Sequence, residues 1–309
     1  MKYVVHGAGA VGGVIGARLH LAGLDITLVA RGAHLAQIRR AGLVLDGAGS
    51  QRVVRPQASD SVAGVTWTDD TVVLLCVKGH QTPGALADLV AHAPIDVPVF
   101  CAQNGVANEP EVQRRFRRTY GLTVMLPSLH LEPGVVVEKC APVPGILDLG
   151  RFPGGVDGVT EQVAADLRAA GFESLPRSDI MAWKYRKLLV NAVGDAAGLA
   201  EVGEDVAALR ADVLAEGEAV FAAAGIEAVS AEQDDARRGD LLRPRADIAS
   251  YPGNSLRQSL TRGVASEIDY RAGELILLGR LHGVATPVNE RLRQRVVEQE
   301  KAQRPTVPG

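Results

Sequence analysis

The sequence predicts an α/β fold with a Rossmann-type N-terminal domain followed by an all-helical C-terminal domain. Strand-like and helical patterns alternate through the first half of the chain, which is typical of a parallel sheet with crossover helices. From about Asp179 to Lys301 nearly every stretch has helical periodicity instead. We therefore place the domain boundary near Pro176 to Asp179, so that residues 1–177 form the first domain and residues 178–309 the second.

A glycine-rich turn follows the first predicted strand, Tyr3 to Val5, and leads at once into a helical pattern. The turn has the form GxGxxG. In a dinucleotide-binding turn, the first glycine permits the tight bend, the second lets the backbone approach a pyrophosphate, and the third lets helix and strand pack closely. An incidental glycine-rich turn is the alternative, but a second strand-like run at 25–29 favours nucleotide binding. The expected cofactor contacts are Gly7, Gly9, Ala10, Val11 and Gly12.

The end of the second strand indicates which nicotinamide cofactor is bound. Its sequence is LVAR, with Arg31 at the tip and no carboxylate. An acidic residue at this position would hydrogen-bond the ribose of NAD, whereas an arginine accommodates the 2′-phosphate of NADP. A solvated surface arginine is the plainer interpretation. We expect NADPH as cofactor.

Composition excludes several other classes of protein. The chain has 309 residues, 33 basic and 36 acidic side chains, and 4% aromatic residues, so neither a basic excess nor stacking platforms indicate nucleic acid. The three cysteines cannot form a closed disulfide framework. No segment is long and apolar enough to cross a membrane, and no signal peptide precedes the first strand, so we expect a cytoplasmic protein without membrane contacts. No metal site is predicted, and a homodimer through the helical domain is left open.

The remaining elements of the first domain follow from short apolar runs and their punctuation. After Arg31 we expect a helix over 33–41, strands over 42–47 and 52–56, a buried strand over 71–78, a helix over 81–91, a strand over 97–105, strand-like pieces over 120–128, 134–140 and 145–152, a helix over 159–170, and a last strand near Phe172. In the second domain, helix breaks are expected near Gly225, Pro244, Pro252 to Gly253, and Gly283 to Pro287.

Two polar residues stand where predicted strands end. Lys78 follows VVLLCV, and Asn104 follows VFCAQ. Ligands of open α/β sheets bind outside the carboxyl ends of the strands. Lys78 is thus suited to contact phosphate or substrate, and Asn104 to position the nicotinamide or a substrate oxygen. Each is also a plausible turn residue.

A polar stripe interrupts the apolar helix predicted from Asp179 to Leu199. Lys187, Asn191 and Asp195 follow one another at i, i+4 spacing and share one face. The stripe either faces solvent, as in an ordinary amphipathic helix, or lines a cleft. Further along, Asn254 or Ser255 is expected to cap a helix, and Glu267 to begin the next one.

These residues together resemble the ketopantoate reductases, which are NADPH-dependent 2-dehydropantoate 2-reductases, and their relatives. The resemblance spans almost the whole chain. It rests on GAGAVGGVIGARL with Arg31, Lys78, QNGV at 103–106, KLLVN at 187–191, Ser255-Leu-x-Gln258, and SEIDY followed by HGVATPVN.

The resemblance implies reduction of a small carbonyl substrate, with ketopantoate as the default. Lys187 is similar to the catalytic lysine of the family and Glu267 to its catalytic glutamate. Lys78 and Asn104 correspond to residues near the nicotinamide and substrate. Asn191 and Ser255 correspond to substrate contacts.

One position departs from the family pattern. Where the family usually has a second substrate-holding asparagine, this chain has Asp195, which we also assign to the substrate site. An ionised aspartate only accepts hydrogen bonds and would repel a 2-oxo carboxylate. Asp195 is therefore expected to be protonated, turned away, or paired with an amine or hydroxyl of a different substrate. Reduction of another ketone or an imine, and a non-catalytic NADP-binding sensor, stay as alternatives.

Overall fold

The computed structural model describes residues 1–248 and 255–303, and the described residues form two compact units. Residues 1–103, 108–181 and 231–248 make up the first, here called the sheet unit. Residues 104–107, 182–230 and 255–303 make up the second, the helical unit. The chain therefore passes between the units more than once. Each unit is described by itself.

The sheet unit is built on a seven-stranded sheet in the order β11-β8-β7-β6-β1-β2-β5. All neighbours pair in parallel except β11 with β8, which confirms the predicted Rossmann-type architecture. The strands are β1 (Lys2–His6), β2 (Asp25–Val29), β5 (Gln57–Ser59), β6 (Thr71–Leu75), β7 (Val99–Cys101), β8 (Thr119–Leu122) and β11 (Leu149–Arg151).

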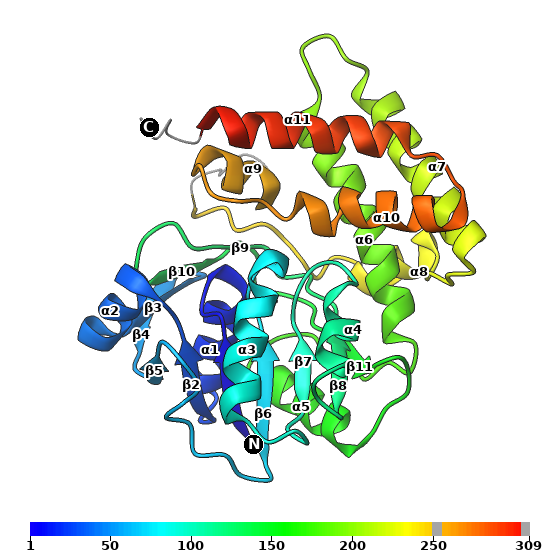
Figure 1. The fold of residues 1–309 in the computed structure, drawn as a ribbon. Helices are drawn as coiled ribbons and strands as arrows, with labels where there is room; N and C mark the ends of the chain where they lie inside the picture. Colours follow the sequence, from blue (N-terminus) through cyan, green and yellow to red (C-terminus); the bar gives the residue numbers. More distant parts are fainter. Residues whose placement is uncertain (249–254, 304–309) are drawn as a thin grey trace, which may run out of the picture. The chain divides into compact units, whose positions relative to one another are not determined.

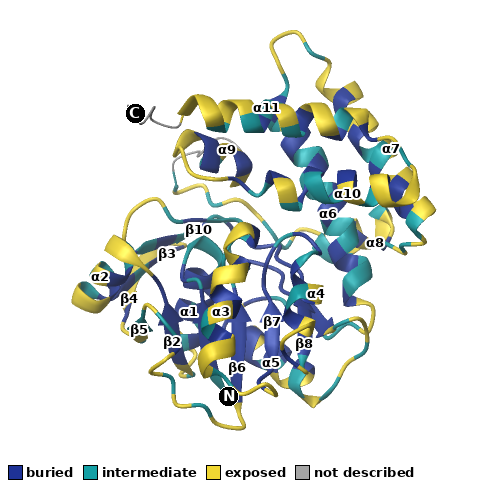
Figure 2. Ribbon diagram, viewed as in Figure 1, coloured by how far each residue is buried: buried dark blue, intermediate teal, exposed yellow. Residues whose placement is uncertain are grey.

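Helices cover both faces of this sheet, as Figure 1 shows. The helices of the sheet unit are α1 (Ala10–Leu21), α2 (Gly32–Ala41), η1 (Gly79–Gln81), α3 (Thr82–His92), α4 (Asn108–Gln113), α5 (Gly158–Ala169) and α8 (Ala231–Arg238). Alternate residues of β1 enter two different apolar cores. Tyr3 and Val5 pack in one and Val4 in the other. Burial on both faces explains why the parallel strands read as continuous apolar runs (Figure 2).

A smaller sheet packs beside α1 within the same unit. Its strands have the order β4-β3-β10-β9, with β3 (Leu43–Gly47), β4 (Ser50–Val54), β9 (Ser128–Leu129) and β10 (Val135–Glu138). Arg18 of α1 donates a hydrogen bond of 2.7 Å from Nη2 to the Glu138 carboxylate of β10. This contact holds α1 against the smaller sheet.

The last strand expected in the first domain does not form. Near Phe172 the chain makes only isolated bridges, Ile146 with Glu173 and Leu149 with Pro176. The backbone pairs only at intervals here: the Leu147 N–H donates to the Glu173 carbonyl oxygen and the Arg177 N–H to the Leu149 carbonyl oxygen, both at 2.8 Å. Phe172 is nevertheless buried in the core, which is the origin of its strand-like pattern.

The described residues of the helical unit form helices and no strands, as predicted. These are α6 (Ile180–Leu199), which begins at the edge of the sheet unit, α7 (Val206–Ala224), α9 (Ser255–Thr261), η2 (Ile268–Tyr270), α10 (Ala272–His282) and α11 (Pro287–Gln303). The helices α7 and α10 end at Gly225 and Gly283, both with positive φ, which confirms two expected breaks. Asn254, a candidate cap, lies outside the described residues. None of the helices described combines the length and apolar character needed to cross a bilayer.

The helix expected to begin at Glu267 is interrupted. A single 3-10 turn, η2, ends at Tyr270, and Arg271 has φ −126° and ψ −92° before α10 begins at Ala272. The sequence pattern missed this break because no glycine or proline marks it. The side chain of Arg271 is instead held inside the unit by the contacts described below.

Candidate functional site

A cavity of about 210 Å³ lies at the start of α1 in the sheet unit. It opens beyond the carboxyl ends of β1 and β2, where ligands of open α/β sheets bind. The residues lining it include His6, Gly7, Gly9, Arg31, Val77 and Gln81. The glycine-rich turn and the arginine that the sequence singled out are thus brought together at one cavity.

The three glycines of the turn meet different surroundings. A Cβ on Gly7 would lie 2.7 Å from the backbone nitrogen of Val77, and one on Gly12 would lie 2.2 Å from the carbonyl oxygen of Gly7. Gly7 also has φ +106°, which favours glycine. A Cβ on Gly9 would meet no atom within 4 Å. Gly7 and Gly12 are therefore required by the protein's own packing, whereas Gly9 leaves space beside the N-terminus of α1.

Space at Gly9 and the helix N-terminus together suit a pyrophosphate. Gly9 is the N-cap residue of α1, and Ala10 and Val11 form its first turn. Backbone N–H groups in the first turn of a helix lack acceptors within the helix and favour anions. The residues present thus fit the pyrophosphate of a dinucleotide.

Arg31 is the second residue after the end of β2 and is the N-cap residue of α2. Its side chain is exposed and lines the cavity. The described structure therefore places a guanidinium at the end of the second strand, where a dinucleotide ribose lies in folds of this class.

A pair of histidines that the sequence analysis missed also lines the cavity. Nδ1 of His34 accepts a hydrogen bond of 2.8 Å from the Gly134 N–H, so its Nε2–H donates to the Ala8 carbonyl oxygen at 2.7 Å. The ring centroids of His34 and His130 lie 4.1 Å apart. Burial and the neighbouring His130 lower the pKa of His34. The neutral ring of His34 thereby ties the glycine-rich turn to α2, a contact that local sequence patterns do not reveal.

Lys78 follows the buried strand β6 and is half-buried. Its backbone N–H donates to Gln81 Oε1 at 3.2 Å, and its carbonyl oxygen accepts from the Gln81 N–H at 2.8 Å. Both Gln81 and Val77, the residue before Lys78, line the cavity. Lys78 therefore lies beside the cavity.

The polar stripe of α6 is not an ordinary solvated face. Lys187 and Asn191 are half-buried, and Asp195 is only 2% exposed. Nδ2 of Asn191 donates to Oδ1 of Asn104 at 3.1 Å. Asn104 belongs to the short segment 104–107 of the helical unit, so two predicted site residues 87 positions apart are in direct contact.

A close backbone approach holds this segment in place. Gly105 has φ +81°, and a Cβ there would lie 2.7 Å from the Tyr270 carbonyl oxygen. Only glycine fits such a position without a shift. The glycine of the QNGV motif therefore has a packing role next to Asn104.

Asp195 is paired with a cation from the same chain. Nη1 of Arg271 donates to both carboxylate oxygens of Asp195, at 2.9 and 3.0 Å, and Nη2 donates to Ser255 Oγ at 2.6 Å. Sequence analysis did not identify Arg271. The one signal was its place directly after the SEIDY motif, and nothing in the sequence connects it with a residue 76 positions away.

Glu267 lies directly before η2 and is half-buried. Its negative charge helps to raise the pKa of Arg271. Glu267 thus belongs to the same charged cluster as Asp195 and Arg271. The helical unit contains every residue predicted for catalysis or substrate binding, namely Asn104, Lys187, Asn191, Asp195, Ser255 and Glu267.

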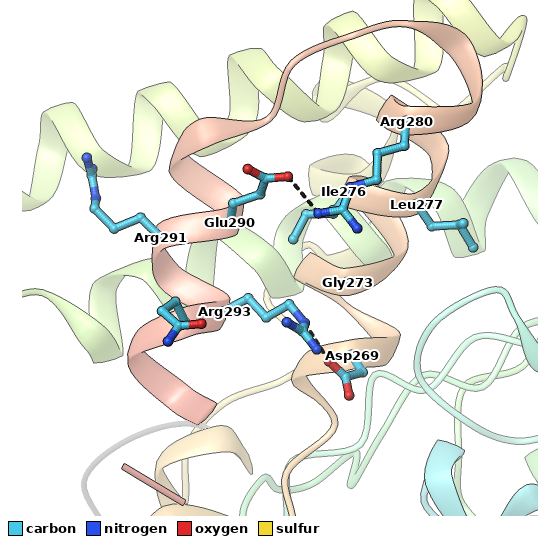
Figure 3. Close-up of a pocket in the computed structure, with 9 residues that line it drawn as sticks. Asp269, Gly273, Ile276, Leu277, Arg280, Glu290, Arg291 and Arg293 are labelled. Carbon is cyan, nitrogen blue, oxygen red and sulfur yellow. Dashed lines mark hydrogen bonds and ion pairs between the residues drawn. The ribbon is translucent and has the colours of Figure 1, made fainter. Parts of the chain in front are cut away.

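A larger hollow of about 640 Å³ lies between α10 and α11 of the helical unit (Figure 3). It contains none of the predicted site residues. Four of its five charged side chains pair with one another, Arg280 with Glu290 at 2.9 Å and Arg293 with Asp269 at 2.7 Å. Size alone therefore does not mark this hollow as the functional site.

Comparison with known proteins assigns the chain to a family. The family described as "Ketopantoate reductase PanE/ApbA" matches residues 3–154, and its C-terminal counterpart matches residues 179–300. The chain belongs to the ketopantoate reductase family. It is accordingly an oxidoreductase of the 2-dehydropantoate 2-reductase type and uses a nicotinamide cofactor.

Two relatives support this assignment over nearly their full length, and a third protein shares the fold. A 2-dehydropantoate 2-reductase of Pyrococcus horikoshii is 28% identical over 94% of both chains. The crystal structure of a PanE/ApbA family ketopantoate reductase from Ralstonia eutropha JMP134 is 27% identical, with a TM-score of 0.83 over 98% of this chain and 99% of the other. A D-mandelate dehydrogenase solved with NADH and anilino(oxo)acetate has the same fold at 23% identity, with a TM-score of 0.83 and the same coverage.

Proposed function

We propose that the protein reduces a 2-oxo acid to the 2-hydroxy acid with NADPH, and that ketopantoate is its first candidate substrate. The observation that carries this proposal is the half-buried stripe of α6, in which Lys187 and Asn191 follow one another and Asn191 is bonded to Asn104. In this account, residues 1–177 form the cofactor domain and residues 178–309 the catalytic domain.

The proposed cofactor site is the cavity at the glycine-rich turn. Gly9 leaves space for the pyrophosphate, and the Arg31 guanidinium supports NADPH because it is suited to bind a 2′-phosphate. When bound, the nicotinamide ring supplies the hydride that reduces the carbonyl carbon. Lys78 and Asn104 are proposed to hold the nicotinamide and the substrate next to each other.

Lys187 is the proposed proton donor. As negative charge develops on the carbonyl oxygen, an ammonium group stabilises that charge and then donates a proton to the oxygen. Glu267 is proposed to orient the lysine or the hydroxyl group of the substrate. Asn191 and Ser255 hold the acid in register by hydrogen bonding.

The pairing of Asp195 with Arg271 favours an acid over a cationic substrate. Asp195 was the reason to consider an amine-bearing ketone or an imine. Because Arg271 already supplies the positive charge, a cation from the substrate is not required. The acid is therefore the leading candidate, with the other ketone or imine second.

NADPH oxidation with a panel of 2-oxo acids tests the proposal. The panel includes ketopantoate and phenyl-substituted 2-oxo acids, each with and without ammonia, and NADH replaces NADPH in a parallel series. We expect turnover with at least one 2-oxo acid without ammonia, and a preference for NADPH. Turnover only with ammonia would favour the imine, and no turnover with any substrate would favour the non-catalytic sensor.

A further inference from the structure

A buried arginine of the helical unit lies between a carboxylate and a hydroxyl. Arg271 is 4% exposed and its partner Asp195 is 2% exposed. Its guanidinium group donates from Nη1 to Asp195 and from Nη2 to Ser255 Oγ. The third donor, Nε, is also buried and has no hydrogen-bond partner among the described residues. The described residues therefore leave the Nε–H of this guanidinium without an acceptor.

The cluster has one cation and two carboxylates. Burial by itself would lower the pKa of Arg271, but the charges of Asp195 and Glu267 outweigh it and raise that pKa. The guanidinium is consequently always charged. Without it, the buried Asp195 would lose the cation bonded to both of its carboxylate oxygens, and its negative charge would repel an anionic ligand bound nearby.

The contact with Ser255 also fixes the role of its hydroxyl. An arginine only donates hydrogen bonds, so Ser255 Oγ is the acceptor in this contact. The hydroxyl hydrogen of Ser255 is then free to be donated to another acceptor. A hydroxyl that accepts a charge-assisted hydrogen bond is polarised and becomes a better donor. A carboxylate oxygen is a suitable acceptor for that hydrogen.

We propose that Arg271 determines the specificity of the site for a carboxylate beside the reacting carbonyl. It acts as a positioning residue, because it cancels the charge of Asp195 and orients the Ser255 hydroxyl toward an anionic ligand. This inference rests on the proposed function, and it adds a residue and a charge mechanism to it. Asp195 thus requires Arg271, whereas Arg271 does not require Asp195 to favour an acid.

The test compares two substrates that differ only in charge. One is the best 2-oxo acid of the wild-type protein, and the other is its methyl ester, which retains the ketone without the carboxylate. The variants are Arg271→Met, Asp195→Asn, and the double variant with both changes. Arg280→Met is the matched control, because Arg280 forms an exposed ion pair with Glu290 in the same unit.

We expect Arg271→Met to raise KM for the acid at least about tenfold, with KM for the ester and kcat changed less than about threefold. The double variant recovers most of this loss, to within about threefold of wild type, because the charge of Asp195 is gone, and the difference that remains reflects the lost contact with Ser255. Asp195→Asn alone keeps or strengthens the preference for the acid. Arg280→Met leaves KM and kcat unchanged for both substrates.

The pH dependence gives an independent measurement on the same variants. In Arg271→Met, Asp195 lacks its cation and its carboxyl group binds a proton more readily, so KM for the acid falls again as the pH is lowered. The wild-type protein and the double variant lack this recovery. Merely structural damage would not produce a recovery at low pH.

Several results overturn the inference. It is contradicted if Arg271→Met raises KM equally for acid and ester. It is also contradicted if KM for the acid does not recover in the double variant, or if Asp195→Asn prefers the acid less than the wild-type protein does. If Arg271→Met does not fold, the double variant and Asp195→Asn still decide. Wild-type reduction of the ester but of no acid refutes this inference alone, whereas reduction of neither refutes the proposed function and this inference with it.

Discussion

Asn191 and Asn104 are joined by a hydrogen bond of 3.1 Å between their side-chain amides. The bond connects the polar face of α6 with the QNGV segment, and Gly105 packs that segment against Tyr270. An amide that donates to another amide fixes the direction in which both groups point. The remaining donor and acceptor groups of this pair are thereby fixed in direction, as the proposed substrate site requires.

Substitution of Asn191 tests this arrangement. We expect Asn191→Ala to raise KM for the 2-oxo acid about tenfold, because one substrate contact and the orientation of Asn104 are lost together. Asn191→Asp should be worse, since an aspartate does not donate to Asn104 and repels the acid. Steady-state kinetics measure both variants. Unchanged KM in both would remove Asn191 from the site.

The glycines of the turn offer a matched pair of variants. A methyl group on Gly9 meets no protein atom, so Gly9→Ala should fold normally and weaken NADPH binding at least about tenfold by blocking the pyrophosphate. A methyl group on Gly12 overlaps the Gly7 carbonyl oxygen, so Gly12→Ala should lower the free energy of unfolding by about 1–3 kcal/mol. Thermal unfolding and NADPH titration separate the two effects. Normal NADPH affinity in Gly9→Ala would contradict the assignment of this cavity.

Arg31 is expected to select NADPH over NADH. Arg31→Ala should raise KM for NADPH about tenfold or more, because a charge-assisted bidentate contact is lost, and should change KM for NADH less than about twofold. Arg40→Ala is the control, since Arg40 is exposed on the same helix and bonded to Gln37. Equal losses for the two cofactors would mean that Arg31 does not bind the 2′-phosphate.

His34 should make stability depend on pH. Its pKa lies below the ordinary value of 6.5, mainly because of burial. The unfolded chain therefore binds a proton at this residue more readily than the folded chain, so stability is full above about pH 6.5 and decreases as the pH falls below it. In urea unfolding, the free energy of unfolding of His34→Gln should change less steeply with pH than that of the wild-type protein. His6, whose pKa is also lowered by burial, accounts for part of the pH dependence that remains. The exposed His282→Gln should have the wild-type slope; an identical slope in His34→Gln would contradict the prediction.

The sequence predicted the sheet unit well because its signals are local. The strand, the GxGxxG turn and the helix follow one another within a few residues, and Gly7 and Gly12 are required by the protein's own packing. The place of Arg31 at the cavity was also predictable, because it follows the second strand, whereas its selection of the cofactor stays a prediction.

What the sequence could not predict depends on contacts between distant residues. Asp195 appeared to be an unwanted charge because its partner, Arg271, lies 76 positions away and breaks a helix that has no glycine or proline at that point. The strand expected near Phe172 was wrong because a buried apolar residue was mistaken for a paired one. The His34 contact with Ala8 was missed because an isolated histidine carries no pattern.

The central claim is that Lys187 protonates a 2-oxo acid reduced with NADPH, and Lys187→Ala tests it most directly. We predict that the wild-type protein forms one 2-hydroxy acid for each NADPH consumed. Lys187→Ala should decrease kcat by about 10²–10⁴-fold, while Kd for NADPH changes less than about twofold. Lys187→Arg, which keeps the charge but holds its proton, should recover KM more than kcat. Near-normal turnover in Lys187→Ala would contradict the account.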